Sequence, residues 1–256
     1  MTAGVKRADT QDESDSAREL REKKRVLAAL VVHDLRSPLS AIQGYLELLR
    51  EEIAAHPDPK QANGYIDDAT TLLGKALGLV ATILDVDELE DGILHANIQP
   101  VRLIELVDRA RAGARPHFEV RQLGCDVDVD PDMLVNVDRE LFGRVIENML
   151  DNATRYAPRG GKCGIAAQFI TTALGPTLEV AIGNNGPPVP EAERDRIFGR
   201  YFQVERRRAS ARANRGLGLY FCKLAIEAHG GTIHVETRGE LGAVFVVRVP
   251  KNPAIE

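Results

Sequence analysis

Two stretches of apolar residues, spaced alternately four and three apart, constrain the fold of this chain most strongly. This alternation places the apolar side chains on one side of an α-helix, as the seam of a helical bundle requires. The segment AAHPDP separates the two stretches. The seam positions are Ala28, Val32, Leu35, Leu39, Ile42, Leu46, Leu49 and Ile53, and then Ile66, Ala69, Leu73, Ala76, Val80 and Ile83. Residues 28 to about 90 are therefore predicted to form a helical hairpin.

A single hairpin cannot bury both seams well. Two hairpins from two copies of the chain would complete an antiparallel four-helix bundle, in which each copy supplies half of the core. The sequence therefore predicts a homodimer.

Composition limits the classes of function. The chain has 256 residues, of which 44% are apolar and 28% charged, so it has enough apolar residues for two modest cores. Its net charge of -5 does not favour a nucleic-acid partner. The apolar runs 27–32 and 243–247 are shorter than the roughly 20 residues that span a bilayer, so no direct membrane insertion is expected. Three cysteines without a CxxC pattern indicate a reducing, cytoplasmic location.

The pattern changes after Gly92. Alternating strand-like segments and helical segments follow one another around a Gly/Pro loop, which predicts an α/β sandwich of the kind that binds nucleotides. The predicted fold class is thus α + α/β, a dimeric helical hairpin followed by an α/β sandwich. The predicted divisions are a flexible tail (1–14), a dimerisation domain (15–97) and a nucleotide-binding domain (98–252).

The segment HDLRSPL gives the first helix a candidate nucleophile. Val32 and Leu35 lie on the seam, so His33 projects from the outer flank of the bundle. Asp34 can hold the Nδ1 proton of that imidazole and leave Nε2 free to attack phosphorus. Ser37 shares the face of His33 and could position a water for the reverse, dephosphorylating reaction. A lone helical histidine is more often structural, and it is this neighbourhood that favours chemistry.

A second candidate site lies in ELFGRVIENMLDNATRYAP. Asn148 and Asn152 stand at i and i+4 on one helical face and offer two neutral oxygens to a hard cation such as Mg2+. Arg155 could meet a phosphate and Tyr156 a purine face, although both also suit an ordinary helix end.

Two glycine-bearing segments complete the nucleotide hypothesis. GNNGPPVP is a rigid loop after a strand and contains Asn184 and Gly186. RGLGLYFCK enters a helix whose first amides favour phosphate; its turn consists of Arg215, Gly216, Leu217 and Gly218. Between the two segments lies an arginine-rich stretch that begins near Arg200. It is interpreted as a mobile lid over the triphosphate, with a solvated loop or a nucleic-acid patch as the other interpretations.

HDLRSPL, ENMLDNATRY, GNNGPPVP, IFGRYF, RGLGL and GELGAVF occur in the order and spacing of the sensor histidine kinases of two-component systems. Over roughly residues 20 to 250 the chain resembles that family, with its dimerisation and phosphoacceptor domain and its GHKL-type ATPase domain.

The resemblance implies roles for individual residues. His33 would be the phosphoacceptor, Asp34 its activating acid, and Ser37 stands where the family has a Thr or Asn used in phosphatase activity. Asn152 with Asn148 would hold Mg2+. The remaining implied nucleotide contacts are Arg155, Tyr156, Asn184, Gly186, Arg215, Gly216, Leu217 and Gly218. ATP would be the phosphoryl donor, and an aspartate of a response regulator protein would receive the phosphoryl group. Phe198 and Phe202 resemble the aromatic pair beside the lid, with core packing as the alternative.

Three residues depart from the family pattern. Asn184 stands where the family usually has the Asp that accepts a hydrogen bond from the adenine amino group. An amide can accept or donate there, and the expectation is that the preference for adenine is retained, so that GTP does not bind. Pro188 replaces a usual glycine, and Asn214 stands at the first glycine of the last phosphate turn, which predicts weaker or slower ATP binding.

Two alternatives remain open at the level of sequence. ATP hydrolases related to DNA gyrase share the nucleotide fold but use a Glu as general base where Asn148 stands. The only acid nearby, Glu147, lies about 100° around the helix from Asn148. The other alternative is a catalytically weak dimeric scaffold or phosphatase that docks a response regulator.

Overall fold

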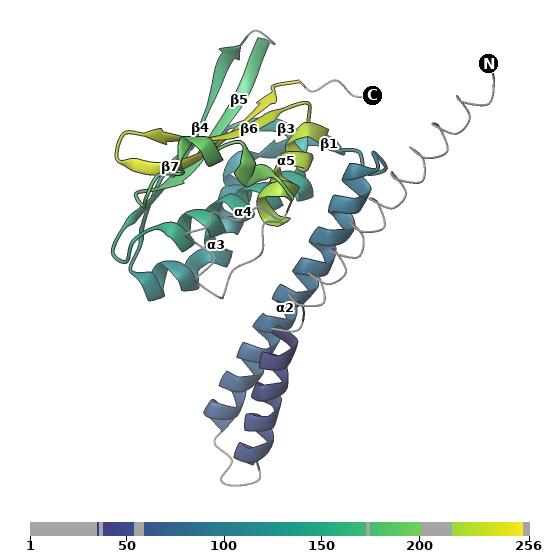
Figure 1. The fold of residues 1–256 in the computed structure, drawn as a ribbon, viewed down its shortest axis with the longest axis vertical. Coiled ribbons are helices and arrows are strands. Elements are labelled where there is room, and N and C mark those ends of the chain that lie inside the picture. Colours follow the sequence, from purple (N-terminus) through teal and green to yellow (C-terminus); the bar gives the residue numbers. More distant parts are fainter. Residues whose placement is uncertain (1–34, 36–37, 54–58, 173–174, 201–216, 253–256) are drawn as a thin grey trace, which may run out of the picture. The chain divides into compact units, whose positions relative to one another are not determined.

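The structure is a computed structural model, and it describes residues 35, 38–53, 59–172, 175–200 and 217–252 (Figure 1). The chain divides into two compact units between Ala81 and Thr82. The described residues of the first unit are helical, and the second unit contains every strand that the described residues form.

The first unit contains the predicted hairpin. Residues 38–53 are helical, and so is α2 (Pro59–Glu90). The AAHPDP segment that was predicted to separate the two helices lies, apart from Pro59, outside the described residues. Ala69 and Ala76 of the second seam are buried. Seam positions seven residues apart are instead exposed on both helices, at Leu39, Leu46 and Ile53 and at Ile66, Leu73 and Val80. Among the described residues, each helix therefore carries an exposed apolar stripe with a seven-residue spacing.

Helix α2 is unusually apolar along its exposed length. It is the one helix among the described residues that is long and apolar enough to cross a membrane, with a mean hydropathy of 1.5 over 18 residues of which 12% are buried. The same side chains supply the seam of the hairpin, so length and composition alone do not distinguish a bundle helix from a membrane span.

The second unit has two layers (Figure 1). Its main sheet has the strand order β2-β4-β5-β7-β6, in which β2 runs parallel to β4 and every other neighbouring pair is antiparallel. Strands β1 and β3 form a separate antiparallel pair. The elements are β1 (Ile98–Arg102), α3 (Leu103–Arg121), β2 (Gly124–Asp128), β3 (Leu134–Asp138), α4 (Arg139–Tyr156), β4 (Lys162–Thr172), β5 (Gly175–Asn184), η1 (Glu191–Glu193), η2 (Arg196–Phe198), α5 (Leu217–Ala228), β6 (Thr232–Arg238) and β7 (Leu241–Pro250).

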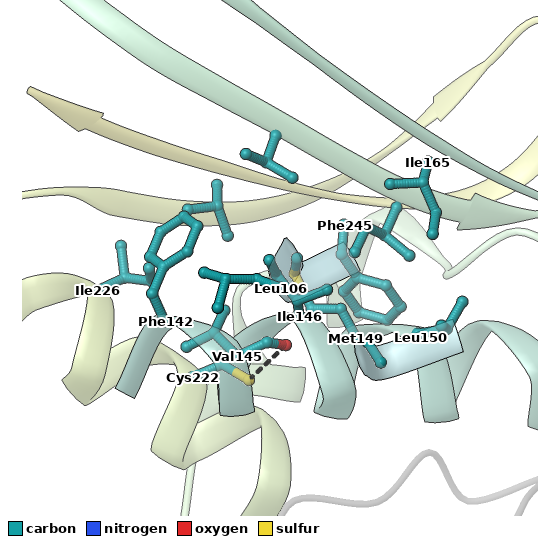
Figure 2. Close-up of a cluster of buried hydrophobic side chains, with 14 of the residues drawn as sticks. Leu106, Phe142, Val145, Ile146, Met149, Leu150, Ile165, Cys222, Ile226 and Phe245 are labelled. Carbon is teal, nitrogen blue, oxygen red and sulfur yellow. Dashed lines mark hydrogen bonds between the residues drawn. The ribbon is translucent and has the colours of Figure 1, made fainter. Parts of the chain in front are cut away.

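Helix α4 lies at the centre of the core. Figure 2 shows Phe142, Ile146 and Met149 of this helix pointing toward the strands of the sheet, in one cluster with Ile165 of β4 and Phe245 of β7. All five side chains are buried. The apolar side chains of α4 recur with the helical period, so burying them against the sheet leaves the opposite stripe of the helix for polar residues.

Side chains from neighbouring elements hold both ends of α4. Asp138 caps the N-terminus, because its Oδ1 accepts from the backbone N–H groups of Glu140 and Leu141 at 2.9 Å each. At the other end Arg121 of α3 donates to the carbonyl oxygens of Thr154 at 2.9 Å and Ala157 at 2.6 Å, and also to that of Arg155. A cation at a helix C-terminus also compensates the helix dipole. The helix that carries the predicted metal ligands is thus fixed in position along its length.

A buried histidine links α5 to the start of α4. The ring of His229 lies 1% exposed and packs edge-on against Phe142, with centroids 5.7 Å apart. Its Nδ1 donates to the carbonyl of Ala225 at 2.6 Å, and its Nε2 accepts from the backbone N–H of Asp138 at 2.9 Å. Burial lowers the pKa of His229, so the ring is held neutral.

The three cysteines are free thiols of the second unit. Cys163 and Cys222 are buried, as expected of small core residues, and Cys125 is partly exposed. The Sγ of Cys222 donates to the Val145 carbonyl at 3.8 Å (Figure 2). Burial raises the pKa of Cys163 to about 12 and also raises that of Cys222 and Cys125.

Candidate nucleotide site

The polar stripe of α4 presents the two predicted metal ligands. The Nδ2 of Asn148 donates to the carbonyl of Arg144, and the Nδ2 of Asn152 donates to the carbonyl of Asn148, each at 2.9 Å. Both amides are therefore oriented by their own helix, and both Oδ1 atoms keep their lone pairs for a ligand. Neutral amide oxygens of this kind suit a hard cation such as Mg2+.

The last residue of the glycine turn that the sequence predicted to bind phosphate, Gly218, lies next to Asn148. Leu217 and Gly218 open α5, and a methyl group on Gly218 would lie 2.6 Å from Asn148 Oδ1. Only glycine permits this approach without displacing the amide. The structure thus brings together two motifs that lie 70 residues apart in the sequence.

The loop after β5 lies against the C-terminal end of α4. A methyl group on Gly186 would stand 2.2 Å from the Tyr156 carbonyl oxygen, and one on Gly242 would stand 2.0 Å from the Gly186 carbonyl oxygen. Asn185 fixes the same loop, because its Oδ1 accepts from the backbone N–H of Lys162 at 2.8 Å. Gly242 was not predicted as a site residue from the sequence, although the GELGAVF motif that contains it could have indicated it.

Asn184 is the last residue of β5 and is 1% exposed. Its Oδ1 accepts from the backbone N–H of Gly186 at 2.7 Å. Its Nδ2 is buried and has no hydrogen-bond partner. Leaving a buried donor unpaired costs about 1–3 kcal/mol, so such an atom needs an explanation in a ligand or in the fold.

Two charged residues of α4 are already paired. The Arg155 guanidinium donates to Asp151 at 2.5 Å, so the phosphate contact expected of Arg155 stays a prediction. Glu147 accepts from Arg109 of α3 at 2.9 Å. The carboxylate of Glu147 is therefore engaged with α3 and directed away from Asn148, which agrees with its predicted helical phase.

The last turns of α2 belong to the same compact unit and contact the start of the site. Arg144 pairs with Asp85, donates to Thr82 Oγ1 at 3.1 Å and lies 4.3 Å from the ring centre of Phe221. These contacts were not predicted. The sequence gives no periodic signal for them, because they join a helix end to residues about 60 positions away.

Glu90, at the C-terminus of α2, binds Arg200, the first arginine of the predicted lid. It accepts from Arg200 at 2.8 Å and from the hydroxyl of Tyr220. Burial and the Glu90 carboxylate raise the pKa of Tyr220 to about 12. Arg200 is thus ion-paired with Glu90, whereas the sequence pattern placed it among the lid arginines.

Several predicted residues lie outside the described part of the chain. They are His33, Asp34, Ser37, Phe202, Asn214, Arg215 and Gly216. Phe198 is described and is 5% exposed, with its ring edge-on to Phe245 at 6.4 Å between centroids. Core packing, the alternative given for Phe198, is therefore its observed role.

Comparison with known families connects these features. Residues 23–92 match the His Kinase A (phospho-acceptor) domain, and residues 137–253 match the histidine kinase-, DNA gyrase B- and HSP90-like ATPase family. This chain belongs to the sensor histidine kinase family. The ATPase match implies an ATP-binding site in this chain, and the residues brought together around α4 lie within the matched range.

The chain matches curated sensor proteins that are longer than itself. It is 29% identical over 253 residues to the sensor protein KdpD of Escherichia coli, which covers 96% of this chain and 26% of the relative. It is 28% identical over 219 residues to the alginate biosynthesis sensor protein KinB of Pseudomonas aeruginosa, covering 85% and 35% of the two chains. The chain thus spans between about a quarter and 40% of the curated relatives it matches.

Solved structures share the fold of this chain. The catalytic domain of histidine kinase ThkA matches with a TM-score of 0.53 at 27% identity, covering 62% of this chain and 99% of that one. The Acinetobacter baumannii histidine kinase AdeS matches with a TM-score of 0.60 at 21% identity, covering 86% and 98%. A complex of ThkA with the response regulator protein TrrA matches with a TM-score of 0.57 at 22% identity, covering 94% and 66%. At identities of 21% and 22% the last two show the fold alone.

Proposed function

We propose that this chain is a histidine autokinase that transfers the γ-phosphoryl group of ATP to His33 and then to an aspartate of a response regulator. The observation that carries the proposal is the convergence on α4. Asn148 and Asn152 present their amide oxygens there, and Gly218 approaches Asn148 closely. The ThkA complex contains a response regulator, which supports a partner of the same class here.

The proposed reaction is an in-line displacement at the γ-phosphorus. His33 Nε2 forms the new bond to phosphorus while the bond from phosphorus to the bridging oxygen breaks, and ADP leaves. Asp34 holds the Nδ1 proton, so that Nε2 keeps its lone pair. Mg2+, held by Asn148 and Asn152, would supply charge neutralisation for the phosphates. The amides at the start of α5 favour the same negative charge.

The second candidate is a dimeric scaffold or phosphatase that docks a response regulator without appreciable kinase activity. It is favoured by the departures from the family pattern at Asn184, Pro188 and Asn214, which would weaken ATP binding. Direct hydrolysis of ATP by water is the weaker alternative, because Glu147 is bound to Arg109.

The assembly and location proposed are a cytoplasmic homodimer that neither binds nucleic acid nor inserts in a membrane. The exposed seven-residue stripes on both hairpin helices support a second copy as their cover, because a four-helix bundle would bury them. The net charge of -5 supports the exclusion of nucleic acid.

Autophosphorylation is tested with γ-labelled ATP and Mg2+. We expect acid-labile, alkali-stable label on the protein, and none on His33→Gln. Asn152→Ala should also lose label, because its amide oxygen is a proposed metal ligand. His95→Gln is the matched control, since His95 is an exposed histidine outside the proposed site, and it should label like the parent.

The outcomes distinguish the candidates. Label that persists in His33→Gln would refute His33 as the acceptor. A parent that binds ATP without being labelled, yet speeds the loss of phosphate from a phosphorylated response regulator, would favour the phosphatase. Light scattering tests the dimer, and a monomer at micromolar concentration would contradict that part of the proposal.

A further inference from the structure

Asn184 has one half of its amide engaged and the other half unpaired. The engaged half is Oδ1, which accepts from the Gly186 backbone N–H at 2.7 Å. The unpaired half is Nδ2, which is buried without a partner at the end of β5. This residue thus offers hydrogen-bond donors, and no second acceptor atom, to whatever approaches it.

The backbone N–H of Gly186 determines which way the Asn184 amide is oriented. A flipped side chain would bring two donors, Nδ2 and the Gly186 N–H, to within hydrogen-bond distance of each other. The loop cannot easily move to avoid this. Gly186 already lies against the Tyr156 carbonyl, and Gly242 lies against the carbonyl oxygen of Gly186. Oδ1 therefore faces Gly186, and Nδ2 faces away from it.

The neighbourhood restricts what can satisfy Nδ2. An amide nitrogen does not bind cations, so this atom is no part of the proposed metal site. Asn184 accepts from Gly186, and Gly186 lies against the carbonyl of Tyr156. Tyr156 is the last residue of α4, two turns beyond Asn148 on that helix. A nucleotide with its phosphates near Asn148 and Gly218 would extend its base along α4 toward this end.

We propose that Asn184 donates from Nδ2 to an acceptor on the Watson–Crick edge of a purine and does not recognise the adenine amino group. The acceptor is N1 in adenine and O6 in a 6-oxopurine. This inference rests on the proposed nucleotide site. It replaces the retained adenine preference expected from the sequence, which left open whether the amide accepts or donates.

The contrast with a carboxylate makes the inference testable. An Asp at 184 would accept from Gly186 with one oxygen and from the adenine amino group with the other. With Asn, the adenine amino group would instead face the two N–H donors of Nδ2, and two donors cannot form a hydrogen bond. The amino group therefore adds nothing to the affinity of the parent protein. Removing the amino group should therefore cost the parent protein little.

The experiment measures dissociation constants for three Mg-nucleotides by calorimetry: ATP, purine riboside triphosphate and inosine triphosphate. The second lacks the amino group and keeps N1 as an acceptor, and the third carries O6. The proteins are the parent, Asn184→Asp and Asn185→Asp. The last is the matched control, because it adds the same charge one residue away and keeps the Oδ1 contact to Lys162.

The parent should bind all three nucleotides within about threefold of one another, and Asn185→Asp should show the same ratios. Asn184→Asp should prefer ATP over the other two by about tenfold or more, because a charge-assisted hydrogen bond to the amino group is gained. Circular dichroism and thermal melting establish that each variant is folded before the ratios are compared.

A parent that binds ATP at least about tenfold more tightly than purine riboside triphosphate would overturn the inference. The three parent constants decide this even if Asn184→Asp does not fold. A parent that binds none of the nucleotides would instead refute the proposed nucleotide site, so the two failures are distinguishable.

Discussion

Gly186→Ala is the substitution whose effect follows most directly from the geometry. The added methyl carbon would lie 2.2 Å from the Tyr156 carbonyl oxygen and 2.7 Å from Asn184 Oδ1. Contacts below 3.0 Å essentially do not occur, so either the loop or the end of α4 must move by about 1 Å. Arg121 holds that end of α4, and Gly242 blocks the loop from the other side.

The magnitude follows from this confinement. Overpacking in a fixed environment costs about 1–3 kcal/mol. For a unit of this size, each kcal/mol lowers Tm by roughly 2–4 °C, so a fall of roughly 2–12 °C is expected. The same displacement breaks the hydrogen bond that orients Asn184, so ATP affinity should fall by about tenfold.

Differential scanning fluorimetry and calorimetric titration with ATP measure the two effects. Gly113→Ala is the control, because Gly113 lies within α3 with nothing within 4 Å of its added methyl group. A helical Gly→Ala change there should leave Tm unchanged or raise it. A Gly186→Ala protein with the Tm and ATP affinity of the parent would refute the reasoning.

Three further predictions concern the ends and faces of α4. Arg121→Met removes the cation that binds three carbonyl oxygens, so urea denaturation should show a loss of about 1–3 kcal/mol; an unchanged midpoint would contradict the capping role. The folded pKa of His229 is lowered, so the unfolded state binds more protons as the pH falls below about 6.5. Stability should therefore decline on acidification by at most about 1.4 kcal/mol per pH unit from this residue, and His229→Gln should flatten that slope in melts from pH 7.5 to 5. Glu147→Gln should retain ATP-dependent labelling, because Glu147 faces Arg109. Loss of label there would reopen its role as a base.

The sequence predicted those features that depend on local periodicity. Asn148 and Asn152 share a face because they are four apart in a helix, and Glu147 points elsewhere for the same reason. The strands and helices from β1 to α4 follow equally clear patterns. The seams of the hairpin are also local, and the helical assignment over 38–53 and in α2 is confirmed.

Strand β4 was not predicted, because its sequence KCGIAAQFITT has small side chains where polar residues would mark an outward face. Its pairing, parallel to β2 and antiparallel to β5, depends on tertiary contacts between segments that periodicity cannot relate. The direction of the Asn184 amide is a third case. It is decided by one backbone N–H two residues away, whose position the sequence does not specify.

The state of the three cysteines has a practical consequence for spectroscopy. Alkylating reagents act on thiolates, and burial holds the pKa of Cys163 at about 12 and raises that of Cys222 and Cys125. Near neutral pH an added, exposed cysteine should react far faster than these three. Probes could therefore be attached at chosen positions of the hairpin and of the second unit without first removing the native thiols. Distance changes between labelled sites could then be followed in the otherwise unaltered protein.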